Sequence, residues 1–137
     1  MGDETKQWVA VTVLVFRAGR MLSMRRASTQ EAGSGLWEGV SGRVRAGEDP
    51  IAAARREVVE ETGLRVQISP QPIIAYAALR RGEPMTVIVF SAIHESGEVT
   101  LSDEHDEHRW CEVCELTELG VPVQLADAAR AVWPSSE

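Results

Sequence analysis

The segment at residues 42–64 reads GRVRAGEDPIAAARREVVEETGL and carries the clearest structural signals in the chain. Asp49 followed by Pro50 is typical of a helix start, because Asp caps the free amides of the first turn and Pro fits the first helical position. Gly63 stands where a left-handed cap is expected to end the helix. We therefore predict a helix over residues 50–62, with a backbone turn at Gly42 before it.

One exposed face of this predicted helix carries three glutamates. At about 100° per residue, Glu57, Glu60 and Glu61 project to the same side. Hard cations such as Mg²⁺ take carboxylate oxygens together with substrate phosphates as ligands. Arg56 is adjacent and can pair with a glutamate or a phosphate, but only partly offsets the repulsion on this face. The face is therefore a candidate metal site; its simpler interpretation is an ordinary solvated helix surface.

The flanking sequence predicts strands on both sides of the helix. The run WVAVTVLVF at residues 8–16 is β-branched and apolar throughout, which is typical of a strand buried on both faces. Further extended segments are expected at residues 21–26, 36–44, 66–69, 73–79, 85–94 and 109–113, with a closing helix at residues 123–132. Residues 95–108 form an acidic loop in this interpretation, with room for a short strand at 99–101. The element order favours one domain of α+β or layered α/β/α type.

Composition limits the classes of function. The 137 residues include 14 Lys and Arg against 21 Asp and Glu, a formal net charge of −7, which disfavours duplex nucleic acid as a partner. The chain has no apolar run long enough to span a membrane, a polar start and two cysteines, so we expect a cytoplasmic protein without a disulfide framework. Eleven of the acids fall in two windows, residues 48–61 and 103–115. Acids at this density need solvent or a cation to offset their repulsion.

The helix segment is similar to a known motif. It matches the Nudix box, G-x5-E-x7-R-E-U-x-E-E-x-G-U with U aliphatic, at every specified place: Gly42, Glu48, Arg56, Glu57, Val58, Glu60, Glu61, Gly63 and Leu64. On these residues the chain resembles the Nudix hydrolase family, related to MutT. The resemblance implies an α/β fold, a Nudix-type α/β/α sandwich with a mixed sheet and its catalytic helix at about residues 50–62.

The resemblance also implies an activity and a metal site. The expected reaction is Mg²⁺-dependent hydrolysis of a nucleoside diphosphate linked to another moiety, and Mn²⁺ can substitute. The metal ligands it implies are the three helix glutamates with a backbone carbonyl before the helix: Glu57, Glu60, Glu61 and Ser41 or Gly42. The two acidic windows would then meet around the cation.

Individual roles within the box follow from the same resemblance. The residues with catalytic roles would be Glu57, Glu60, Arg56 and Glu104. The general base would be a box glutamate or Glu104 on the later loop, with Glu107 second. Glu48 and Gly63 would be structural, and Glu48 and Arg56 would orient the loop and the carboxylates.

The substrate is expected to be a small nucleotide-type polyphosphate. Residues 79–82 contain neither the tyrosine nor the proline that marks two Nudix subfamilies, which leaves a (deoxy)nucleoside triphosphate, normal or damaged, as the leading class. Side chains that could contact it are Arg25, Arg26, Trp37 and Tyr76, each of which could instead be ordinary surface or core. A homodimer is compatible with the resemblance.

Two other functions stay open at this point. A non-catalytic domain that senses nucleotides or binds proteins could use the same fold, since a fold does not fix activity. An acidic calcium-binding domain is the other, although calcium loops take their ligands from a loop and not from one helix face.

Overall fold

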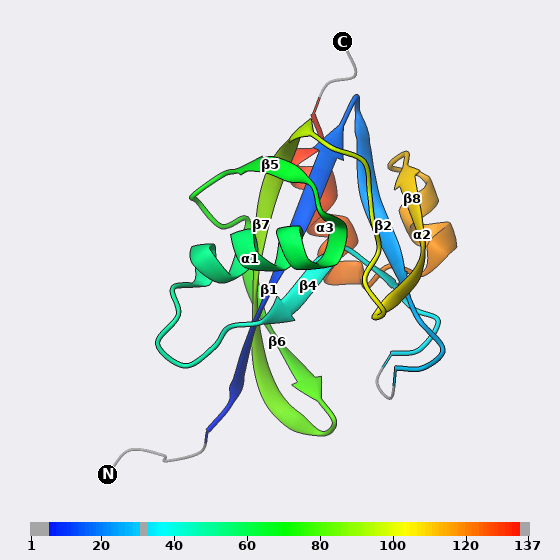
Figure 1. Cartoon of the computed structure of the whole chain (residues 1–137). Coiled ribbons are helices and arrows are strands. Elements are labelled where there is room, and N and C mark those ends of the chain that lie inside the picture. Colours follow the sequence, from blue (N-terminus) through cyan, green and yellow to red (C-terminus); the bar gives the residue numbers. More distant parts are fainter. Residues whose placement is uncertain (1–5, 31–32, 135–137) are drawn as a thin grey trace.

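A mixed β-sheet with helices on both faces forms the protein (Figure 1), here as a computed structural model that describes residues 6–30 and 33–134. The strands are β1 Trp8–Arg17, β2 Arg20–Arg26, β3 Trp37–Glu38, β4 Val40–Arg43, β5 Arg65–Ile68, β6 Ile74–Arg80, β7 Glu83–Ser96 and β8 His105–Cys111. The helices are α1 Pro50–Thr62, α2 Glu115–Leu119 and α3 Val123–Val132.

Strand β1 lies at the centre of the sheet, and this position accounts for its apolar sequence. It runs parallel to β7, pairs with β4 along its first half and forms a hairpin with β2 through the turn that follows Arg17. Val11, Val13 and Val15 pack toward α1, whereas Leu14 and Phe16 pack in a second cluster with α2 and α3. A strand with a core on each face is apolar at almost every position, and the buried Thr12 pairs its hydroxyl with that of Ser41.

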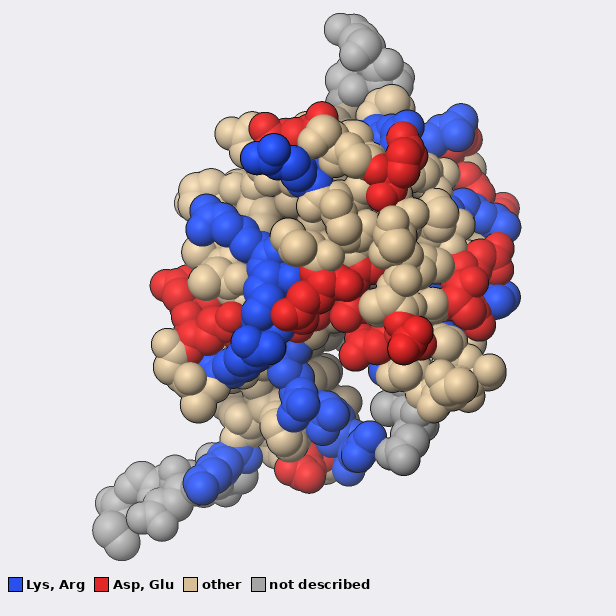
Figure 2. Space-filling view, viewed as in Figure 1, with Lys and Arg blue, Asp and Glu red and all other residues tan. Residues whose placement is uncertain are grey.

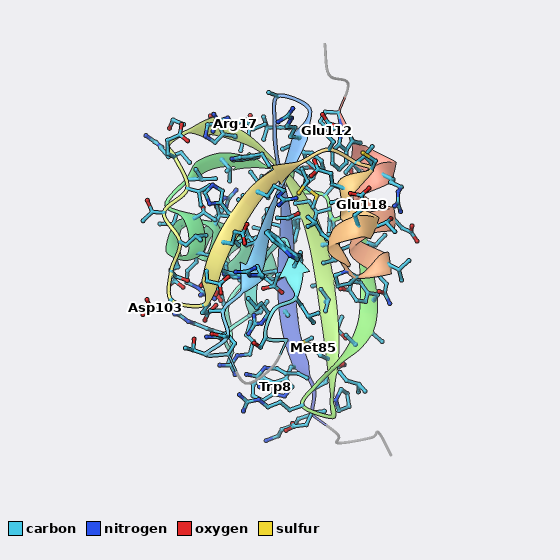
Figure 3. All side chains as sticks on the ribbon, turned by 90° about the vertical axis from the view of Figure 1, so that its right-hand side faces the viewer. Trp8, Arg17, Met85, Asp103, Glu112 and Glu118 are labelled. Atoms are coloured by element: carbon cyan, nitrogen blue, oxygen red, sulfur yellow. The ribbon has the colours of Figure 1, made fainter. Side chains whose placement is uncertain are left out.

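The layers are seen most clearly when Figures 1 and 3 are compared, because α1 lies on one side of the sheet and α2 and α3 on the other. The predicted layered arrangement is therefore the observed one. None of the helices in residues 6–30 and 33–134 combines the length and the apolar character needed to cross a membrane.

Helix α1 begins and ends at the predicted residues. The Asp49 carboxylate accepts a hydrogen bond of 2.9 Å from the amide of Ile51. Gly63 has φ 71° and donates its amide to the carbonyl of Val59. Helix α3 also has its predicted bounds.

The region after β7 differs from the prediction. Residues 99–101 lie outside any strand, and β8 begins at His105, four residues before the expected start. The sequence HDEHRWC contains no apolar run that would predict a strand. Strand β8 forms through its antiparallel pairing with the polar end of β2, where Arg25 lies opposite Glu107. Helix α2, which no sequence pattern predicted, has five residues and buries Leu116.

Candidate active site

The three glutamates of α1 do not share one exposed face. Glu57 and Glu61 are only 7% and 5% exposed, whereas Glu60 faces solvent. The expectation of an exposed acidic face is therefore wrong for two of the three, because α1 packs this side against the end of β4. Burial is the main reason that the pKa of the Glu57 carboxyl is raised, and Glu60 and Glu61 add to the effect.

Gly42 is required by the position of Glu57. A Cβ atom at Gly42 would overlap all three carboxyl atoms of the Glu57 side chain. The backbone of β4 and the helix carboxylate can approach this closely only where residue 42 has no side chain. The hydroxyl of the neighbouring Ser41 lies 2.9 Å from that of Thr12 on β1.

Arg56 holds the carboxylates together. Its guanidinium donates two hydrogen bonds of 2.9 Å to Glu48, one of 2.6 Å to Glu57 and one of 3.3 Å to Glu60. A fourth partner is the carbonyl of Arg43, 3.0 Å from Nη2. One arginine thus contacts three carboxylates and a strand carbonyl, yet its single charge offsets the repulsion only in part, because Glu60 and Glu61 still raise the pKa of Glu57. These contacts also raise the pKa of Arg56.

Glu48 is fixed from two directions. Besides the two bonds from Arg56, its Oε1 accepts the backbone amide of Arg45 at 3.0 Å. The bonds from Arg56 first, and the amide of Arg45 second, lower the pKa of Glu48 from 4.5 to about 2. Glu48 thereby closes the loop between β4 and α1.

This depressed pKa predicts a pH dependence of stability. Because the folded-state pKa lies below the unfolded one, ionised Glu48 stabilises the fold above pH 4.5, and this contribution is lost as the pH falls toward 2. The Glu48→Gln variant should therefore show a smaller loss of unfolding free energy than the wild type between pH 5 and pH 2. Urea denaturation at a series of pH values measures it, and parallel curves for the two proteins would contradict the prediction.

A second group of side chains surrounds Glu61. Ser102 donates a hydrogen bond of 2.6 Å to Glu61 Oε2, and His105 Nδ1 lies 3.3 Å from the same oxygen. Ligand atoms of Glu61, Glu104 and His105 all lie within 4.8 Å of one another. Residues 43 positions apart in the two acidic windows, Glu61 and Glu104, are thus brought to one place by the β7–β8 connection.

His105 links this group to Glu38. Its other ring nitrogen, Nε2, lies 2.9 Å from Glu38 Oε2. Burial alone would lower the pKa of His105, but the carboxylates of Glu38 and Glu61 raise it to about 9. The sequence did not predict that His105 and Glu38 belong to this site, because no local pattern indicates that these two side chains meet.

The pKa values of the two carboxyls in this group, Glu61 and Glu104, shift in opposite directions. Burial alone would raise the pKa of Glu61, but contacts with His105 and Ser102 lower it overall. The pKa of Glu104 is raised, first by burial and then by repulsion from Glu61. Glu104 is therefore the weaker acid of the two neighbouring carboxyls.

The four candidate substrate residues are placed differently from one another. Arg25 pairs with Asp106 at 2.8 Å and with Glu107 at 3.1 Å, and Arg26 contacts Glu38 at 3.2 Å. Trp37 is buried in the core, with the guanidinium groups of Arg25 and Arg109 near its ring. Tyr76 is half-buried, and its pKa is raised mainly by burial and also by Glu38.

The sequence of this chain matches a known protein family. A sequence profile of the NUDIX domain matches residues 6–132. The chain belongs to the NUDIX family. The match covers the whole sheet and all three helices, and so confirms the predicted family.

The chain is also similar to individual proteins of known name. An oxidized purine nucleoside triphosphate hydrolase from Danio rerio is 38% identical over 94 residues, which are 67% of this chain and 58% of that protein. An octanoyltransferase from Myxococcus xanthus is 36% identical over 98 residues, 69% of this chain and 27% of that protein. The chain therefore spans only part of the length of these two relatives. The solved structure of a MutT protein from Methanosarcina mazei Go1 has TM-score 0.82 over 95% of both chains at 24% identity, which shows the Nudix fold.

Proposed function

We propose that this Nudix protein is a Mg²⁺-dependent pyrophosphohydrolase that cleaves a nucleoside diphosphate linked to another moiety. The observation that carries the proposal is the convergence of carboxylates from two distant segments, with Glu61 and Glu104 beside the Arg56-bound Glu57 and Glu60. Such a group of carboxylates is stable only with counter-charges, of which Arg56 and His105 supply part.

The donor set fits a hard divalent cation. The ligands we propose are the carboxylates of Glu57, Glu60 and Glu61 with the carbonyl of Gly42 or Ser41. All offer oxygen, and Gly42 lies against Glu57, so that a strand carbonyl and a helix carboxylate are neighbours. When bound, the cation would neutralise phosphate charge and acidify a water molecule.

The side chains around this donor set have distinct proposed roles. Arg56 orients Glu57 and Glu60, and His105 with Ser102 orients Glu61. Glu104 is the proposed general base that takes the proton of the attacking water, because its raised pKa brings it closer to neutral pH. The water oxygen forms a new bond to phosphorus and one P–O bond of the anhydride breaks, which gives a nucleoside monophosphate or its equivalent and a second phosphorylated product.

The proposed substrate is a (deoxy)nucleoside triphosphate or a damaged nucleotide. The similarity to the Danio rerio hydrolase of oxidized purine nucleoside triphosphates supports this class. The half-buried Tyr76 and the ion-paired Glu38 offer an aromatic ring and hydrogen-bond acceptors for a base.

A turnover screen tests the proposal. We expect hydrolysis of nucleoside triphosphates or 8-oxo-dGTP to be faster than hydrolysis of dinucleoside polyphosphates, nucleotide sugars and capped RNA ends, as measured by chromatography of the nucleotide products. EDTA should abolish the reaction, and added Mg²⁺ or Mn²⁺ should restore it. Turnover that persists in EDTA would contradict the metal dependence, and binding without turnover of any compound would favour the nucleotide-sensing alternative.

A further inference from the structure

Glu38 and His105 form a buried pair beside the proposed metal ligands. His105 Nε2 lies 2.9 Å from Glu38 Oε2, although the two residues are 67 positions apart in the chain. The His105 side chain is fully buried, and that of Glu38 is 16% exposed. A buried carboxylate or imidazole needs a polar partner to offset its loss of hydration, and here each residue supplies one to the other.

The two side chains meet across β2. This strand pairs with β3 on one side and with β8 on the other. Glu38 on β3 lies directly opposite Met24, and Met24 packs in the core cluster that includes α1. Directly opposite residues of a sheet share a face, so Glu38 is on the face of the sheet that α1 covers.

A β-bulge places His105 on the same face. Arg25 lies opposite Glu107, whereas the next residue of β2 lies opposite His105. Asp106 is therefore an extra residue of β8. Asp106 and Glu107 both contact Arg25, on the other face. The extra residue shifts the alternation of β8 by one position, and His105 consequently points toward α1 and its carboxylates.

The hydrogen bond to Glu38 sets the direction of the His105 ring. The second ring nitrogen, Nδ1, faces Glu61 Oε2 at 3.3 Å. Among residues 6–30 and 33–134, no group forms an aligned hydrogen bond with Nδ1. The bond from Nε2 to Glu38 is therefore the one that fixes the ring, and with it the position of the nitrogen that Glu61 faces.

Glu38 is held in turn by Arg26. Arg26 Nη1 donates a hydrogen bond of 3.2 Å to the carboxylate oxygen that His105 approaches, and Nη2 donates one of 3.2 Å to Gln30. Figure 2 shows Asp and Glu side chains gathered in a patch beside a band of Lys and Arg. Carboxylates at such density repel one another, so their positions depend on partners of this kind.

We propose that Glu38 is a positioning residue, which acts through His105 to hold the Glu61 carboxylate in the orientation that binds the cation. This rests on the proposed function, which makes Glu61 a metal ligand. Groups that orient metal ligands typically contribute about 10- to 100-fold to metal affinity. The role requires no contact between Glu38 and the cation or the nucleotide.

Binding of Mn²⁺ to the nucleotide-free protein tests this role. Electron paramagnetic resonance measures free Mn²⁺, so it gives the dissociation constant without turnover. Glu38→Met keeps the length of the side chain but removes the acceptor for His105, and should weaken Mn²⁺ binding at least about tenfold. Glu38→Gln keeps an acceptor oxygen and should recover most of the affinity. Unchanged affinity in Glu38→Met would overturn the proposal.

Two further variants separate positioning from charge. Glu38→Asp keeps the charge but withdraws the carboxylate from His105, so it should weaken binding as Glu38→Met does, and it serves as the test if Glu38→Met does not fold. Wild-type affinity in Glu38→Asp would show an effect of charge alone and overturn the proposal. Glu115→Gln is the matched control, because Glu115 is a half-buried carboxylate of α2 that pairs with Arg109, and it should keep wild-type affinity.

A double substitution shows whether the effect passes through His105. In a His105→Asn background, Glu38→Met should change the Mn²⁺ affinity by less than about twofold, because the ring that Glu38 orients is gone. A further tenfold loss in that background would overturn the proposal.

The positioning role and the proposed reaction fail in different ways. Mn²⁺ binding that depends on Glu38, without hydrolysis of any nucleotide, would overturn the reaction and leave the positioning role standing. Hydrolysis by Glu38→Met with a raised KM for the nucleotide and wild-type Mn²⁺ affinity would leave the reaction standing. That result would assign Glu38 to nucleotide binding and overturn the positioning role.

Discussion

Replacing Glu61 by Gln is expected to lower kcat/KM for the preferred nucleotide by more than about 100-fold, since even the partners that orient metal ligands typically contribute 10- to 100-fold. The amide keeps the shape of the side chain but removes the charge that faces His105, Ser102 and the proposed cation. Initial rates at increasing Mg²⁺ concentrations measure the effect. The half-saturating Mg²⁺ concentration of the variant should be higher than that of the wild type.

A matched control separates this effect from a general change in charge. Glu98→Gln removes a carboxylate that is 84% exposed and only weakly paired with Arg17, at 3.4 Å, so its rate should equal that of the wild type. Glu60→Gln should also reduce the rate, because Glu60 belongs to the same proposed ligand set. Unchanged turnover in both the Glu61 and the Glu60 variants would rule out the proposed metal site.

Adding a single methyl group at Gly42 is expected to be nearly as damaging. The new Cβ overlaps the Glu57 carboxyl, which is already held at 2.6 Å by Arg56, so either β4 or Glu57 has to move. Displacement of a catalytic group by about 1 Å can cost roughly 100-fold in rate. Overpacking also costs about 1–3 kcal/mol of unfolding free energy. Steady-state kinetics and urea denaturation of Gly42→Ala measure the two effects.

Two further variants test the cause. Gly120→Ala also adds a methyl to a glycine, at φ 75° and with no atom within 4 Å, so it should lower stability by about 1–2 kcal/mol and leave the rate unchanged. Shortening the carboxylate in Gly42→Ala/Glu57→Asp should make the double variant more stable than the sum of the single changes predicts. Additive losses would show that contact with Glu57 is not the source of the defect.

The elements that sequence predicted correctly are those with local causes. The bounds of α1 depend on Asp49, Pro50 and Gly63, which act on backbone groups within one turn. The apolar run of β1 is likewise sufficient to predict a strand. Helix α2 and the first four residues of β8 were not predicted, because β8 depends on pairing with β2, whose residues lie 79 to 90 positions earlier in the chain.

The candidate active site also has some features that the sequence predicts and others that it does not. By itself the sequence determined the residue types and their spacing: a capped helix with glutamates at 57, 60 and 61, an arginine at 56 and a glycine at 42. That pattern was enough to predict the family, which the NUDIX match confirms, and to propose the chemistry.

Only the tertiary structure decided which of these groups meet and which are buried. It placed Glu57 and Glu61 against the sheet, joined Arg56 to three carboxylates and set His105 between Glu38 and Glu61. The net charge of −7 did not predict that Arg43 and Arg80 both lie over the ring of Trp8. Burial, ion pairing and close backbone approach depend on the packing of segments distant in the chain, whereas caps and periodicity depend on the nearest few residues.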